Sequence, residues 1–153
     1  DRNLGANSLK SALFRTGRPV LMCPPNHDVP PGFGSHVAIA WNGSLEAARA
    51  VSMTLDLVGK ADSVTILSGG NDDAQDTTAA ALVAYYALHG VTAEVHAFSG
   101  RNPGELLLSK TADVGANMLI MGAYGQNHER ETLFGGNTQN VVDQTELPVV
   151  LVH

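Results

Sequence analysis

Two glycine-containing turns are the parts of this sequence best suited to hold a charged ligand. The first has the sequence Trp-Asn-Gly-Ser at residues 41–44, and the second runs from Gly122 to Gly136. Glycines let the backbone approach a ligand closely, and the N–H groups and dipole of a following helix favour an anion. The second turn is therefore a candidate phosphate cradle, to which Thr138 could add a hydroxyl. The competing interpretation is that the glycines only mark turns.

The elements that must position these turns are short apolar runs alternating with helical patterns. The apolar runs are residues 18–23, 36–41, 63–67, 118–121 and 148–152, with a weaker alternating run at 93–98. Most are continuously apolar, which is typical of strands covered on both faces. Helices are predicted over residues 44–58, 74–89 and 137–145. Another is predicted to start with Asn102 as its N-cap, Pro103 in its first position and Glu105 three residues on from the cap.

From His36 onward, strands and helices alternate to the end of the chain. This order predicts an α/β fold with an open, five-stranded parallel sheet and helices on both faces. We expect the strand order 3-2-1-4-5, which puts the switch point between the first and fourth strands. Ligands bind beyond the carboxyl ends of the strands at such a point. Because the two glycine turns follow these two strands, the sequence predicts one cleft built from both.

The first 26 residues look like the end of a second copy of this unit. Residues 11–23 resemble residues 140–152, and Pro148 follows Pro19 by 129 residues (148 − 19), about the length of one domain. We therefore expect residues 1–26 to be the closing helix and strand of a preceding repeat. The Pro- and Gly-rich residues 27–35 are the expected linker, and residues 36–153 the complete domain. The alternative is a chance likeness between two helix–proline–strand segments.

Composition excludes several classes of protein. The formal net charge is −6 and no run of Lys and Arg occurs, which argues against nucleic-acid binding. No apolar stretch approaches the roughly 20 residues that a membrane helix needs. The single cysteine, Cys23, rules out an intrachain disulfide framework, so a cytoplasmic setting is expected. The histidines are scattered without metal-ligand spacing, so no metal site is predicted.

The spacing Gly122-x2-Gly125-x9-Gly135 resembles the G-x2-G-x9-G-[S/T] signature of the universal stress protein family. Residues 36–44 (HVAIAWNGS), 116–122 (ANMLIMG) and 145–152 (TELPVVLV) are similar to other segments of that family. The resemblance covers about residues 36–153, and residues 8–24 match the end of a second unit. It implies a Rossmann-like fold of the adenine nucleotide alpha hydrolase kind and a role in the stress response.

The resemblance also implies a ligand, ATP or a related adenine nucleotide, with or without Mg. Residues of the first turn would lie near the adenine, two residues ending the second strand would offer backbone groups to the base, and the second turn would follow the ribose and phosphates. Trp41 is expected to pack at the strand end rather than to stack on the base. The implied nucleotide-binding residues are Trp41, Asn42, Gly43, Ile66, Leu67, Gly122, Gly125, Gln126, Gly135, Gly136 and Thr138.

Two residues depart from the family pattern. Asn42 stands where the family has Asp in the first turn, and Gly136 stands where it has Ser or Thr after the third signature glycine. A lost hydroxyl removes one charge-assisted hydrogen bond, worth roughly 1.5–3 kcal/mol. That loss corresponds to an affinity about ten to a hundred times lower. The sequence therefore predicts weakened nucleotide binding, with backbone amides as the remaining donors.

Partners and alternative functions follow from the same pattern. In the family, closing strands pair antiparallel, so residues 18–23 should flank residues 147–152, in a tandem repeat or a homodimer. We expect a binding or regulatory protein without catalytic residues. One alternative is a slow ATPase or pyrophosphatase, because residues 68–73 (SGGNDD) resemble the SGGxDS loop of ATP pyrophosphatases. The other is an interaction protein that dimerises and binds no nucleotide.

Overall fold

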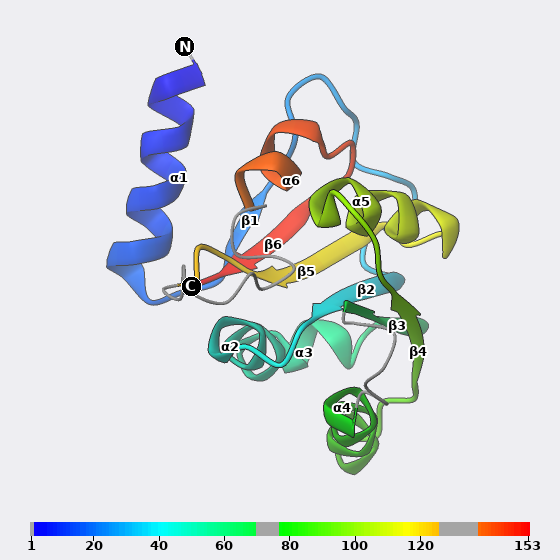
Figure 1. The fold of residues 1–153 in the computed structure, drawn as a ribbon. Coiled ribbons are helices and arrows are strands. Elements are labelled where there is room, and N and C mark those ends of the chain that lie inside the picture. The colour runs from blue at the N-terminus through cyan, green and yellow to red at the C-terminus, as the bar shows by residue number, and fades with distance from the viewer. Residues whose placement is uncertain (1, 70–76, 126–137) are drawn as a thin grey trace.

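The computed structural model describes residues 2–69, 77–125 and 138–153 (Figure 1). In chain order the elements are α1 (Arg2–Thr16), β1 (Val20–Met22), β2 (His36–Trp41), α2 (Leu45–Met53), α3 (Leu55–Val58), β3 (Ser63–Gly69), α4 (Thr77–Leu88), β4 (Ala93–Phe98), α5 (Pro103–Asp113), β5 (Met118–Gly122), α6 (Thr138–Gln144) and β6 (Val149–Val152). No helix that the structure describes is long and apolar enough to cross a membrane.

The strands form one sheet in the order β1-β6-β5-β2-β3-β4. The five strands from β2 onward are parallel to one another, and β1 is antiparallel to its neighbour β6. Counted from β2, the parallel strands have the order 3-2-1-4-5. The predicted fold class, strand order and antiparallel edge strand are therefore confirmed.

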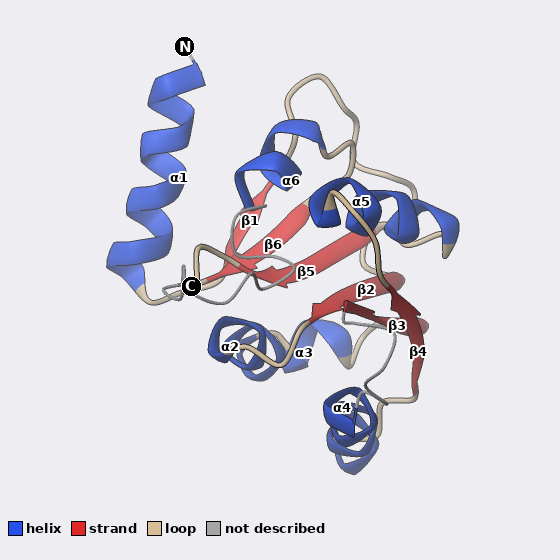
Figure 2. Cartoon of the chain, in the orientation of Figure 1, coloured by secondary structure: helices blue, strands red, loops and turns tan. Residues whose placement is uncertain are grey.

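Helices cover both faces of this sheet (Figure 2). One face carries α2, α3 and α4, and the other carries α5 and α6. Side chains alternate between the two faces along each strand, so Val37 and Ile39 of β2 enter one core, while Ala38 and Ala40 enter the other. Because both faces are covered, the central strands had to be apolar throughout, and this explains the continuous runs in the sequence.

The edge strand β1 is shorter than the predicted run of residues 18–23. Val20 lies opposite Leu151, Leu21 opposite Val150, and Met22 opposite Val149. α1 precedes this strand and is docked by Leu13, which is 2% exposed and belongs to the core on the α5 and α6 face.

The two helix-to-strand connections that the sequence aligned share a local hydrogen bond. The hydroxyl oxygen of Thr16 accepts the N–H of Arg18 at 3.2 Å, and that of Thr145 accepts the N–H of Leu147, also at 3.2 Å. Each threonine therefore closes the turn that leads into a proline and a strand.

Two further predicted boundaries were wrong. The helix expected over residues 44–58 breaks at Thr54, whose hydroxyl donates to the carbonyl of Ala50 at 2.6 Å and whose backbone leaves helical geometry. β3 continues to Gly69, two residues beyond the apolar run, because Ser68 stays paired with both neighbouring strands and Gly69 with β4. The predicted start of α5 is confirmed, since Asn102 is at the N-cap position before Pro103, although Asn102 has φ +55° and its side chain makes no capping bond.

Candidate functional site

The first turn and the described start of the second, residues 122–125, follow the carboxyl ends of the neighbouring strands β2 and β5. These strands are neighbours in the sheet, with Ile39 opposite Ile120. A β-carbon placed on Gly122 would come within 2.6 Å of the carbonyl carbon of Glu46 and 2.7 Å of the backbone nitrogen of Ala47. Only glycine permits so close an approach of β5 to the first turn of α2. Gly122, the first residue of the second turn, therefore packs against the helix that follows the first turn, and a shared cleft stays a prediction.

The first turn is built by its own polar side chains. The side-chain oxygen of Asn42 accepts the N–H of Ser44 at 3.0 Å, and the hydroxyl of Ser44 caps α2 by accepting the N–H of Ala47 at 3.2 Å. Gly43 between them has φ +72°, a conformation that favours glycine. An amide oxygen accepts this hydrogen bond as a carboxylate would, so Asn42 keeps the turn intact despite replacing the family's Asp.

Trp41 closes β2, and its side chain packs toward α2 and α4. Its indole Nε1 donates to the hydroxyl of Thr78 at 3.0 Å, and its ring lies against the core beneath α2 and α4. Between these helices runs an apolar groove of about 520 Å³, lined by Trp41, Val51, Leu82 and Tyr85 among others. Packing at the strand end was the expected arrangement for this ring.

Ile66 and Leu67 lie inside the protein, before the end of β3. Both side chains are fully buried, on opposite faces of the sheet. The residue of β3 opposite Trp41 is Ser68, and Gly69 follows it. The sequence missed these two residues at the strand end, because they are polar or small and extend a strand whose apolar run stops earlier. Contact of Ile66 and Leu67 with a base stays a prediction.

The second turn is held from α6. The N–H of Tyr124 donates to the hydroxyl oxygen of Thr138 at 3.1 Å, and the phenol of Tyr124 donates to the side-chain oxygen of Gln139 at 3.0 Å. Thr138 is 1% exposed, so its hydroxyl orders the turn from within. Burial, and secondarily the charge of Asp143, raise the pKa of Tyr124, which keeps the phenol a neutral donor at physiological pH. The other predicted residues of this turn, Gln126, Gly135 and Gly136, lie outside the described residues.

Glu46 is a site residue that the sequence did not single out. One oxygen of its carboxylate lies 3.3 Å from the position that a β-carbon would take on Gly125. An acidic residue in the first turn of a helix is ordinary, so its type and position carried no signal. A carboxylate there can accept hydrogen bonds from hydroxyl groups and repels phosphates. Beside Gly125 it therefore favours a sugar over an anion.

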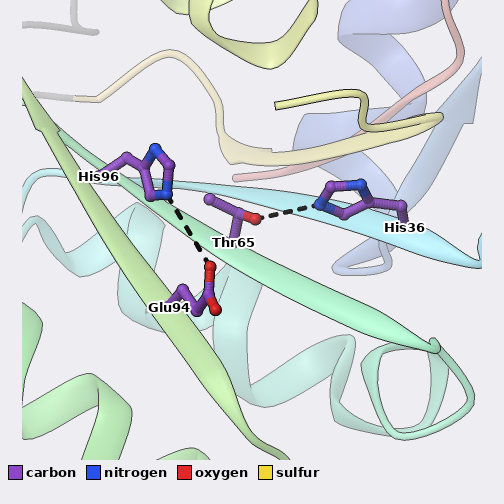
Figure 3. A network of polar contacts seen from close by, with 4 residues as sticks. All are labelled: His36, Thr65, Glu94 and His96. Carbon is purple, nitrogen blue, oxygen red and sulfur yellow. Dashed lines mark hydrogen bonds and ion pairs between the residues drawn. The ribbon is translucent and has the colours of Figure 1, made fainter. Parts of the chain in front are cut away.

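A second polar region lies on the sheet face that carries α5, near the amino ends of the strands (Figure 3). Nε2 of His36 and the hydroxyl of Thr65 are 3.0 Å apart, and Nε2 of His96 is 4.0 Å from the carboxylate of Glu94. These side chains line an open hollow of about 570 Å³. Within the described ranges, no group of three or more His, Cys, Asp or Glu side chains is placed to hold a metal ion.

The fold and the two adjoining turns define the class of protein: a Rossmann-like α/β protein with its candidate site at the switch point of the sheet. A family model described as the universal stress protein family matches residues 60–153. The chain belongs to the universal stress protein family. A search among curated proteins finds no match.

Solved structures share the fold. A universal stress protein from Archaeoglobus fulgidus DSM 4304 superposes with a TM-score of 0.73 and 22% identity, over 94% of this chain and 52% of that chain. A universal stress protein in complex with cAMP superposes with a TM-score of 0.63 and 21% identity, over 78% of this chain and 96% of that chain. A putative universal stress protein from Pseudomonas aeruginosa UCBPP-PA14 superposes with a TM-score of 0.60 and 20% identity, over 88% of this chain and 51% of that chain. The chain thus spans about half the length of the first and third.

Proposed function

We propose that this chain is a stress-response binding protein whose cleft, at the carboxyl ends of β2 and β5, takes an adenine nucleotide, with ATP as the first candidate. The observation that carries the proposal is the packing of Gly122 against the first turn of α2, which joins the two glycine turns into one site. Membership of the universal stress protein family supports it, as does a structural neighbour that holds cAMP. The proposed setting is the cytoplasm.

Glu46 suggests how the nucleotide would be oriented. Its carboxylate next to Gly125 suits the ribose hydroxyls, which can donate hydrogen bonds to it. A phosphate at about 4 Å from this charge would be disfavoured by roughly 1–4 kcal/mol, depending on the local dielectric. We therefore propose that the base lies toward Asn42 and the ribose at Glu46. The phosphates would extend beyond Gly125 toward Thr138, with Gln126, Gly135 and Gly136 as further predicted contacts.

The same proposal covers the partner. Residues 1–26 are proposed to be the closing helix and strand of a preceding unit, and β6 the strand through which two units pair. The likeness of the two helix-to-strand connections, with Thr16 and Thr145 in the same role, supports this assignment.

Calorimetric titration with MgATP tests the nucleotide proposal. We expect saturable heat from the wild-type chain and its loss in Gly125→Val, whose added carbons would occupy the space beside Glu46. Gly5→Val is the matched control, because nothing lies within 4 Å of a β-carbon at Gly5 in α1. Absence of heat and of any thermal shift at millimolar nucleotide would refute the proposal. Phosphate release above the buffer rate would instead favour the hydrolase alternative.

A further inference from the structure

The glycine turn after β5 is contacted from outside its own unit by α1. The ring of Phe14 lies 5.7 Å from the ring of Tyr124, centroid to centroid, and packs edge-on against His153 at 4.4 Å. The ammonium group of Lys10, one helical turn earlier, is 5.6 Å from the centre of the Tyr124 ring. One face of α1 therefore covers the side chain at the tip of the candidate site.

This contact sits on a firmly docked part of α1. Leu13 next to Phe14 is buried in the same core as Val141 of α6 and Leu151 of β6. Phe14 itself is 49% exposed, so about half of its surface is covered. Figure 1 shows the C-terminal end of α1 beside the end of the chain, where β6 leads to His153.

The turn needs such support because Tyr124 has an unfavourable backbone. Its φ of +51° lies in the left-handed region, which non-glycine residues adopt only where the surroundings fix them. Two hydrogen bonds, to Thr138 and Gln139, hold Tyr124 from α6. Its ring also contacts Phe14 and Lys10 of α1. The conformation of the turn is thus shared between an element of its own unit and an element that precedes it.

We propose that α1 sets the conformation of residues 122–125, the start of the second glycine turn, through the contact of Phe14 with Tyr124, and thereby regulates the nucleotide affinity of the cleft. Phe14 and Tyr124 are positioning residues, since neither is placed on the ligand. The regulation rests on the proposed nucleotide-binding function, whereas the hold of α1 on the turn does not. A ligand that binds only when residues 122–125 hold this conformation loses affinity in proportion to the population of that conformation.

Two measurements on Phe14→Ala test the proposal. Amide hydrogen exchange at Tyr124, followed by NMR without ligand, reports the turn, and calorimetry with MgATP reports affinity. We expect exchange at Tyr124 to accelerate and the Kd to rise, each about three- to tenfold, the range for loss of one aromatic pair. Phe14→Tyr, which keeps the ring, should restore both values to within about twofold of the wild type.

Phe33→Ala is the matched control, because Phe33 is 37% exposed and lies just before β2, at the amino ends of the strands. It should change neither readout. If Phe14→Ala does not fold, Phe14→Leu removes the ring while keeping apolar bulk beside Leu13. Unchanged exchange at Tyr124 overturns the proposal, and so does faster exchange with an unchanged Kd. If the wild-type chain binds no MgATP, both the nucleotide-binding function and its regulation are overturned. Amide exchange at Tyr124 in Phe14→Ala then still decides whether α1 holds residues 122–125.

Discussion

Leu21 of β1 lies directly opposite Val150 of β6, and the residue pairs on either side of them are related by two-fold symmetry. Val20 faces Leu151, and Met22 faces Val149. At the spacing of 129 residues seen between Pro19 and Pro148, the counterpart of Val20 is Val149 and that of Met22 is Leu151. The register therefore has two-fold symmetry about the central pair. β1 occupies the position that β6 of a second, two-fold-related unit would take.

Removing residues 1–26 should therefore make the chain dimerise. The edge of β6, whose side chains are apolar and buried, would be left without a partner, and uncovered edges of this kind pair with other chains. We expect residues 27–153 to run as a dimer with Val150 opposite Val150 of the second copy, measured by light scattering after size exclusion. A peptide of residues 2–26 should compete and return the dimer to monomers. A folded fragment that stays monomeric would contradict the symmetry argument.

The two glycines of the second turn should respond differently to the same substitution. In Gly122→Ala the new methyl group meets the backbone of Glu46 and Ala47, which cannot move without shifting α2. We expect a loss of about 1–3 kcal/mol in the free energy of unfolding. In Gly125→Ala the methyl group meets only the end of the Glu46 side chain, so the change should stay within about 0.5 kcal/mol. Urea unfolding measures both, and equal losses would contradict the packing described for Gly122.

The proposed orientation of the nucleotide makes the charge of Glu46 measurable. Glu46→Gln keeps an oxygen that can accept from a ribose hydroxyl but removes the negative charge. We expect the variant to improve ATP binding relative to adenosine by less than about fivefold, the gain for a phosphate at about 4 Å from the removed charge, because the phosphates are proposed to lie farther away. Titration of both ligands at two salt concentrations measures the ratio, and the gain should shrink at high salt. A gain of more than about fivefold would place the phosphates next to Glu46 and contradict the proposed orientation.

The sequence predicted those parts of the fold that depend on local residue patterns. Ile39 and Ile120 stand in continuous apolar runs because their strands are covered on both faces, and such runs identify buried parallel strands without any knowledge of partners. The glycine spacing in turn identified the second turn before its surroundings were known. Boundaries were less predictable: β3 reaches Gly69 because backbone pairing continues after the apolar side chains end.

What the sequence could not predict depends on partners far apart along the chain. The segment predicted as a linker is tied to the sheet by Asn117, whose amide oxygen accepts the N–H groups of Gly34 and His36 and whose amide nitrogen donates to Gly32 and Ser35. Those residues lie more than 80 positions away from it. A lone asparagine before a strand gives no sign of such a role, just as Glu46 gave no sign of its position beside Gly125.

Tyr86 of α4 carries a hydroxyl whose removal should not weaken the protein. Its side chain is fully buried, and its oxygen is the one buried side-chain polar atom without a hydrogen-bond partner in the part of the chain that the structure describes. A buried polar group left unpaired costs about 1–3 kcal/mol. Tyr86→Phe should therefore leave the free energy of unfolding unchanged or raise it by about 1 kcal/mol. Thermal and urea unfolding measure this, with Tyr85→Phe as the matched loss of a phenol hydroxyl on the same helix.

The same residue should govern part of the stability at high pH. Burial raises the pKa of Tyr86 far above its ordinary value of 10.0, and the neighbouring Tyr85 adds to the shift. As the pH rises past 10, the unfolded chain loses this proton while the folded chain keeps it, so ionisation favours unfolding. Tyr86 therefore leaves the free energy of unfolding independent of pH below about pH 10 and lowers it above that pH, by up to about 1.4 kcal/mol per pH unit. Tyr86→Phe should remove this part of the pH dependence, which is measured as the free energy of unfolding of variant and wild type between about pH 9.5 and 11.5. If the two free energies fall in parallel over this range, Tyr86 ionises as freely in the folded chain as in the unfolded one.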